Sequence, residues 1–78
     1  MKFEFDREKL RRGLMARGLT LSELSRLARV SPPTVTSALA GRPVNMTTAV
    51  RIANALKAHP ARPELEDFLP DVQAEAER

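Results

Sequence analysis

The chain has 78 residues, of which 42% are hydrophobic and only three are aromatic, so it has room for one small domain with an aliphatic core. It contains no cysteine, which excludes disulfides and thiolate metal sites, and no apolar run long enough to cross a membrane. Its first residues lack the apolar segment of a signal peptide, and we expect a cytoplasmic protein.

The net charge of +3 hides an asymmetry along the chain. Residues 1–62 carry a net charge of +8, whereas residues 63–78 carry −5. Between Arg17 and Arg62 the only acidic residue is Glu23. A basic body with an acidic end indicates a polyanionic partner, although the solvated helix faces of a small basic domain would give the same composition.

The first predicted element is a possible strand at Lys2–Phe5, where two phenylalanines alternate with charged residues. Such a strand is too short to be stable alone. No other strand is predicted, so the expected fold requires no sheet.

Four helices are predicted from one repeated pattern. In it, an apolar residue directly precedes the capping residue, and a second apolar residue lies four positions after the capping residue. Glycine or proline then follows three of the four helices. The caps are Asp6, Thr20, Ser31 and Asn45, Glu23 completes a capping box with Thr20, and the stops are Gly18, Gly41 and Pro60. The predicted helices cover residues 6–17, 20–28, 31–39 and 45–58.

A short fifth helix is predicted over 63–69, with Leu65, Phe68 and Leu69 turned inward to close the core. The nine residues after it are acidic and could extend a helix or fray. We therefore expect one domain over residues 1–69 and an acidic C-terminal tail over residues 70–78.

Helical spacing also predicts the core, and two alanines in it, Ala28 and Ala38, suit a close helix crossing. The predicted core residues are Leu10, Leu14, Leu24, Leu27, Ala28, Val30, Val35, Ala38, Leu39, Ala49, Ile52, Ala53 and Leu56. The predicted architecture is all-α, a compact orthogonal bundle of four to five short helices.

The third predicted helix is too short to be stable by propensity and must dock on the others. Val35, Ala38 and Leu39 can face inward, which leaves a small and polar face outward. The outward residues are Pro32, Pro33, Thr36, Ser37 and Ala40. A docked helix with a free polar face is typical of a helix-turn-helix recognition element.

The segment Leu21–Ala40 resembles the helix-turn-helix of the phage repressor and Cro-type (lambda-repressor-like) DNA-binding family. The apolar positions of that family are met by Leu24, Ala28, Val30, Val35 and Ala38. The run LARVSPPTVTSALAGRPV also resembles the lac/purine-repressor headpiece, but that headpiece begins with its helix-turn-helix, whereas here a helix precedes it. The resemblance implies a bacterial or phage regulator of transcription that binds double-stranded DNA in the nucleoid as a homodimer on a pseudo-palindromic operator.

The chain departs from the family pattern at three places. Ser25 stands where alanine is usual, and Arg29 stands where glycine is usual in the turn. A left-handed turn residue other than glycine costs about 1 kcal/mol. Leu14 and Leu39 replace a buried Arg–Glu pair of many phage repressors, and we predict that these two leucines contact each other.

The resemblance places the base-reading residues at the start of the recognition helix: Ser31, Pro32, Pro33 and Ser37. None of these side chains can form the bidentate hydrogen bonds that distinguish guanine or adenine. The proline rings could instead pack on thymine methyl groups, and DNA shape would add to the specificity.

The predicted phosphate-binding residues surround that helix. They are Leu21, Ser22, Thr34, Thr36, Arg29, Arg42, Asn45 and Thr47, of which Leu21, Ser22, Asn45 and Thr47 offer N–H groups at helix starts. For Asn45 a capping role is favoured over DNA contact. Arg26 is a peripheral candidate, whereas Arg11, Arg12 and Arg17 are expected to face solvent.

Catalysis is not supported by the sequence. His59 is the only histidine, it is expected to lie exposed at a helix end, and no metal-ligand spacing or phosphate-binding glycine loop is present. We expect no enzyme activity, no metal and no cofactor.

A protein-interaction role is the alternative function. The same fold occurs in antitoxins, and the acidic segment 63–78, which contains Val72, could bind a protein partner or form a dimer. For the dimer surface two candidates stay open: the pair Phe3 and Phe5, or the fifth helix with the tail.

Overall fold

Five helices surround an aliphatic core in the computed structural model, which describes residues 1–69. They are α1 (Arg7–Arg17), α2 (Leu21–Ala28), α3 (Pro32–Leu39), α4 (Met46–Lys57) and α5 (Pro63–Glu66). The all-α bundle and its first four helices are confirmed within one residue at each end. The fifth helix ends at Glu66, earlier than predicted, and the predicted tail over residues 70–78 lies outside the described residues.

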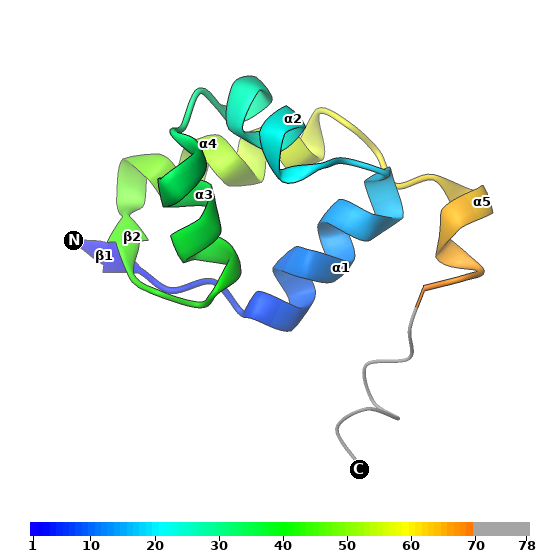
Figure 1. The fold of residues 1–78 in the computed structure, drawn as a ribbon, viewed down its shortest axis with the longest axis horizontal. Helices are drawn as coiled ribbons and strands as arrows, with labels where there is room; N and C mark the ends of the chain where they lie inside the picture. The colour runs from blue at the N-terminus through cyan, green and yellow to red at the C-terminus, as the bar shows by residue number, and fades with distance from the viewer. Residues whose placement is uncertain (70–78) are drawn as a thin grey trace, which may run out of the picture.

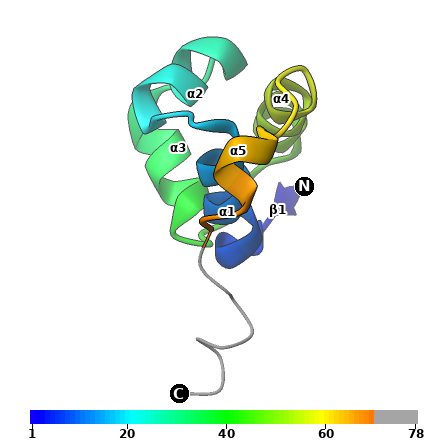
Figure 2. The ribbon, with the colours of Figure 1, turned by 90° about the vertical axis from the view of Figure 1, so that its right-hand side faces the viewer.

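Figure 1 shows α1 below α2, between α3 and α5. In Figure 2 the helices α2 and α3 lie on one side of the bundle and α4 on the other. α2 packs on both α3 and α4, and α1 contacts α3, α4 and α5. The side chains at the centre are Leu24, Ile52 and Val35, which are fully buried. Every buried side-chain nitrogen and oxygen atom in residues 1–69 has a hydrogen-bond partner.

A two-stranded antiparallel sheet joins the start of the chain to the segment before α4. It pairs β1 (Lys2–Phe3) with β2 (Val44–Asn45), and Lys2 lies opposite Asn45 while Phe3 lies opposite Val44. The expectation of no sheet was wrong, because a strand too short to be stable alone finds a partner in the loop that follows α3. The pairing buries Val44, which was not predicted to be in the core.

Two of the four predicted side-chain caps are present. The Asp6 carboxylate accepts hydrogen bonds from the N–H groups of Glu8 and Lys9, at 3.0 and 3.1 Å. Thr20 and Glu23 form the predicted capping box, with distances of 2.9 and 3.1 Å. Gly18 ends α1 in the left-handed conformation, with φ of 66°.

The side-chain caps predicted for Ser31 and Asn45 are wrong. Ser31 is followed by Pro32 and Pro33, which have no N–H to be capped, and its hydroxyl instead pairs with that of Thr34 at 2.8 Å. The Asn45 amide oxygen accepts a hydrogen bond from Lys2 Nζ at 3.0 Å, so the sheet diverts this side chain from α4.

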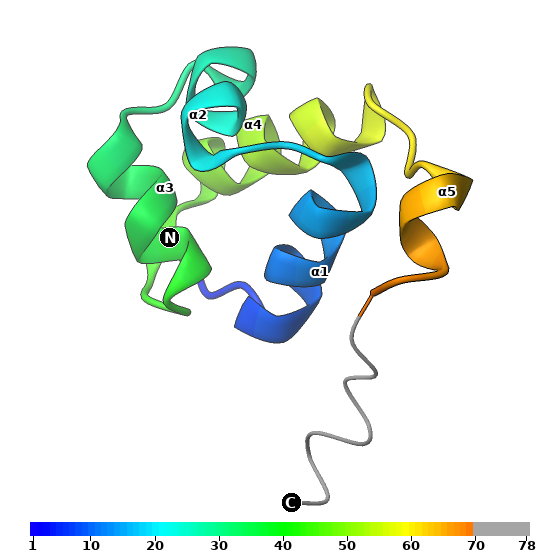
Figure 3. The same cartoon turned by 45° about the vertical axis from the view of Figure 1, so that its right-hand side comes forward.

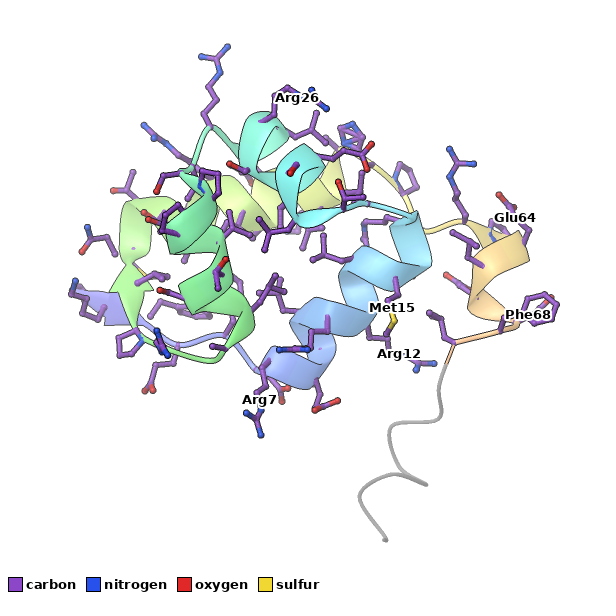
Figure 4. The ribbon with its side chains drawn as sticks, in the orientation of Figure 1. Arg7, Arg12, Met15, Arg26, Glu64 and Phe68 are labelled. Atoms are coloured by element: carbon purple, nitrogen blue, oxygen red, sulfur yellow. The ribbon has the colours of Figure 1, made fainter. Side chains whose placement is uncertain are left out.

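Most predicted core residues are buried, but two apolar predictions were wrong. Leu27 is 41% exposed, because the buried face of α2 runs through Leu24, Ser25 and Ala28 and leaves position 27 beside it. Phe68 is 87% exposed and points away from the bundle (Figure 4), because α5 has already ended. The partly buried members of the predicted set are Leu39, Ala53, Leu56, Leu65 and Leu69, and Ala16 and Ala55 are buried although they were not predicted.

Two arginines of α1 that we expected to face solvent bind the ends of other helices. Arg17 is partly buried, and it donates from Nε to the Leu56 carbonyl at 2.8 Å and from Nη1 to the Gly13 carbonyl at 3.0 Å. Arg11 is exposed, as expected, and also donates from Nε to the Leu39 carbonyl at 3.3 Å. Carbonyls at helix C-termini lack partners within the helix, which explains why both guanidinium groups lie there.

Leu14 and Leu39 line the same apolar groove between α1 and α3. Leu14 is buried, and Leu39 packs against the core. The two leucines therefore line one groove, and both their direct contact and their match to the charged pair of the family stay predictions.

The two remaining departures from the family pattern lie at the end of α2 and in the turn that follows it. Arg29 adopts the left-handed conformation, with φ of 57° and ψ of 46°, as predicted for that position. Ser25 is buried, its hydroxyl donates to the Val30 carbonyl, and its carbonyl accepts the Val30 N–H at 3.0 Å. The serine hydroxyl thus adds to this turn a hydrogen bond that an alanine side chain cannot make.

Replacing Arg29 with glycine should raise the free energy of unfolding by about 1 kcal/mol, because glycine adopts positive φ without a steric penalty. The same replacement at Arg26, inside the last turn of α2, should lower it by about 1 kcal/mol. Urea unfolding followed by circular dichroism measures both changes. A loss of stability in Arg29→Gly would contradict strain at this residue.

The capping box should make the stability depend on pH at acid pH. Hydrogen bonds from the Thr20 backbone and side chain, with the nearby Arg26 charge, lower the pKa of Glu23 below its ordinary value of 4.5. The stabilisation is therefore complete above pH 4.5 and is lost as the pH falls through the lowered pKa. Glu23→Gln keeps an acceptor for the Thr20 N–H but cannot titrate.

Urea unfolding at pH 7 and pH 3 compares the two proteins. The wild type should lose more stability between these pH values than Glu23→Gln, and equal losses would contradict the lowered pKa.

Candidate nucleic-acid interface

The outward face of α3 is the centre of the predicted interface. Val35 and Ala38 have no exposed surface and dock the helix on the bundle. Ser31, Pro32 and Pro33 are exposed, and Ser37 is partly buried one turn after Pro33. Three of the predicted base-reading residues therefore lie exposed at the start of α3, and Ser37 lies one turn further along the helix. Figure 3 shows α3 at one side of the bundle, away from α5.

The start of α3 presents rings and hydroxyl groups rather than free backbone donors. Its first two helical residues are prolines, and the Ser31 carbonyl accepts the N–H groups of Thr34 and Val35 at 3.0 and 3.1 Å. A phosphate would therefore find no N–H cradle here. This helix start suits apolar contact with bases better than it suits anion binding.

The hydroxyl groups of α3 differ in what they can still donate. Thr36 Oγ1 donates to the Pro32 carbonyl at 3.0 Å, so its proton is engaged within the helix. Ser31 and Thr34 share one hydrogen bond, which leaves one of their two protons for an outside acceptor. A phosphate oxygen is an acceptor, so the Ser31–Thr34 pair is the better phosphate donor and Thr36 must first break its own bond.

The starts of α2 and α4 flank α3 and carry helix-dipole charge. In α2 the Thr20 side chain binds the Glu23 N–H, so the N–H groups of Leu21 and Ser22 point out of the first turn. In α4 the Asn45 side chain does not cap the helix, so it does not compete with a phosphate for the N–H of Thr47 in the first turn. Both positions fit the predicted role in phosphate binding.

Two grooves border α3 on opposite flanks. One, of about 320 Å³, joins Pro33, Thr34 and Ser37 to the sheet residues Lys2 and Asn45. The other, of about 500 Å³, is lined by both Thr36 and Leu21. The predicted phosphate-binding residues Thr34 and Asn45 line the first groove, and Leu21 and Thr36 line the second.

The basic side chains occupy the rim. Arg29 and Arg42 are exposed at the two turns that bracket α3, and Arg26 projects from α2 away from the bundle (Figure 4). Sequence reasoning missed Lys2, which the sheet brings to the groove beside Pro33 and Ser37. No local signal could reveal it, because its position depends on pairing across 43 residues.

His59 is partly buried and its Nδ1 lies 3.1 Å from the Ala55 carbonyl, so the expectation of an exposed histidine was wrong. Within residues 1–69 no group of three histidine, cysteine or acidic residues could hold a metal ion. None of the helices in that part of the chain is long and apolar enough to span a membrane.

A family model described as helix-turn-helix matches residues 9–62, more than half of the chain. The chain belongs to the Cro/C1-type helix-turn-helix family. It is therefore a DNA-binding regulator of the Cro type, and the matched region contains α2, α3 and α4 in full and most of α1. No curated protein and no solved structure matches the chain.

Proposed function

We propose that this helix-turn-helix protein is a sequence-specific regulator of transcription that inserts the N-terminal half of α3 into the major groove of an operator. The observation that carries the proposal is that α3 has one buried face and an exposed start. Val35 and Ala38 are fully buried, whereas Pro32 and Pro33 are exposed. Because few side chains of α3 are needed to dock it on the bundle, the residues at its N-terminal end stay accessible to a partner.

Base recognition in this proposal is mainly apolar. The rings of Pro32 and Pro33 pack on thymine methyl groups, and the Ser37 hydroxyl adds one adaptable hydrogen bond. The available side chains give modest discrimination between bases, so DNA shape and the spacing of two half-sites contribute the rest.

Phosphate binding fixes the position of the domain on the duplex. The backbone N–H groups of Leu21, Ser22 and Thr47 meet phosphates on the two flanks of α3, and Arg29 and Arg42 add charge at its ends. The protein works as a homodimer whose recognition helices enter half-sites about 34 Å apart on a pseudo-palindrome.

An exposed aromatic residue favours a second role as a protein-interaction module. Phe68 is 87% exposed and lies within the acidic segment 63–78. A partner such as a toxin could bury this ring. Phe68→Ser should leave folding and DNA affinity unchanged while it weakens capture of such a partner.

Substitutions separate phosphate contacts from base contacts. Arg42→Ala should weaken binding to every duplex by about tenfold, because it removes a charge-assisted contact that carries no sequence information. Ser37→Ala and Pro33→Ala should instead change the preference among duplexes. Fluorescence anisotropy with a selected duplex and a random one measures both effects.

Arg62→Ala is the matched control, because Arg62 is an exposed arginine in the segment before α5 and should not change DNA affinity. An equal effect of Arg62→Ala and Arg42→Ala would contradict the assigned face.

The affinity should fall steeply with salt, because bound phosphates release counterions. The slope of log affinity against log salt should decrease in magnitude by about 1 in Arg42→Ala. A wild-type slope near zero would contradict binding through phosphates.

A further inference from the structure

The outer edge of β1 is the strongest unexplained feature of the described residues. Within residues 1–69 the sheet has only two strands, so no strand lies beside the other edge of β1. We propose that a second copy of this chain pairs there, Lys2–Phe5 against Lys2–Phe5, in an antiparallel arrangement about a two-fold axis. The proposal names the surface of the homodimer that the proposed function requires.

The hydrogen-bond directions in β1 allow this pairing. The Met46 N–H donates to the Met1 carbonyl at 3.3 Å, so Met1 and Met46 are a hydrogen-bonded pair across the sheet. Antiparallel strands alternate, so Phe3 directs its backbone groups toward β2 while Lys2 directs its N–H and C=O toward the open edge. Glu4, two residues on, would direct its own groups the same way in an extended chain.

The charges of this segment select one register. When Phe3 lies opposite Phe3 of the second copy, each Lys2 lies opposite a Glu4, and each Met1 lies opposite a Phe5. Shifts of two residues place Lys2 opposite Lys2, or Glu4 opposite Glu4, which is unfavourable. Shifts of one residue place charged side chains opposite phenylalanine. The segment is therefore self-complementary in a single antiparallel register.

The apolar face of the segment continues onto the bundle. The rings of Phe3 and Phe5 meet edge to face, with centroids 4.9 Å apart, which places them on the same side of the segment. Phe5 packs against the core, whereas Phe3 is 38% exposed. Met46 and Val50, one turn apart on α4, are 40% and 50% exposed. A second copy paired at β1 would bury Phe3 against its equivalent and extend toward this side of α4.

Charge reversal tests the register. Lys2→Glu should raise the dissociation constant of the dimer about tenfold, because both Lys2–Glu4 pairs become like-charge pairs. Glu4→Lys should do the same. The double variant Lys2→Glu/Glu4→Lys restores opposite charges in both pairs and should dimerise within about threefold of the wild type.

The two single variants should also rescue each other. In a mixed dimer of Lys2→Glu with Glu4→Lys, every cross-strand charge pair is again of opposite sign. An equimolar mixture should therefore associate about tenfold more tightly than either variant alone, a result that misfolding could not produce. Lys57→Glu is the matched control, because Lys57 is exposed at the end of α4, and it should leave dimerisation unchanged.

Sedimentation equilibrium of the free protein without DNA measures all six samples: the wild type, the two single variants, the double variant, the mixture and the control. A monomeric wild type at about 1 mM would overturn the proposal, since even a small interface should associate at that concentration. Equal association of the mixture and the single variants would overturn it too. Because no DNA is present, either of these results would leave the proposed DNA-binding role of α3 unaffected. Conversely, a protein that dimerises but does not bind DNA would contradict the DNA-binding role and not the dimer surface.

Discussion

The reciprocal hydrogen bonds between Ser25 and Val30 are the constraint on which the interface depends. They tie the last turn of α2 to the residue before the cap of α3, inside the core rather than at the surface. The bonds hold Arg29 in the left-handed conformation, which redirects the chain by one sharp turn. If this turn were loose, α3 would have no fixed direction, because its own start contains no capping side chain and two prolines.

This constraint explains why so little packing is enough to position α3. Val35 and Ala38 fill the space against the bundle, and Arg11 holds the other end through the Leu39 carbonyl. The helix is therefore fixed at its start, its middle and its end. The surface that remains is small, rigid and poor in donors, which agrees with a partner recognised largely by shape and apolar contact.

Local signals in the sequence were sufficient for the helices and for the buried face of α3. The capping box at Thr20 and the left-handed Gly18 depend on neighbouring residues only, and both were predictable. What could not be predicted depends on distant partners. The sheet pairs Lys2 with Asn45, which brings a lysine to the interface and removes a predicted cap. Helical spacing predicted Phe68 to lie in the core, but α5 ends at Glu66, so helical spacing does not determine where this side chain points.

The most direct test of the account follows the backbone amides of the ¹⁵N-labelled protein during titration with a selected duplex. We predict that the largest shifts fall at residues 21–23, 34–37 and 45–48, and that Pro32 and Pro33 ring protons show contacts to thymine methyl groups. Shifts concentrated on α1 and α5, with those of α3 unchanged, would contradict the claim that α3 enters the major groove.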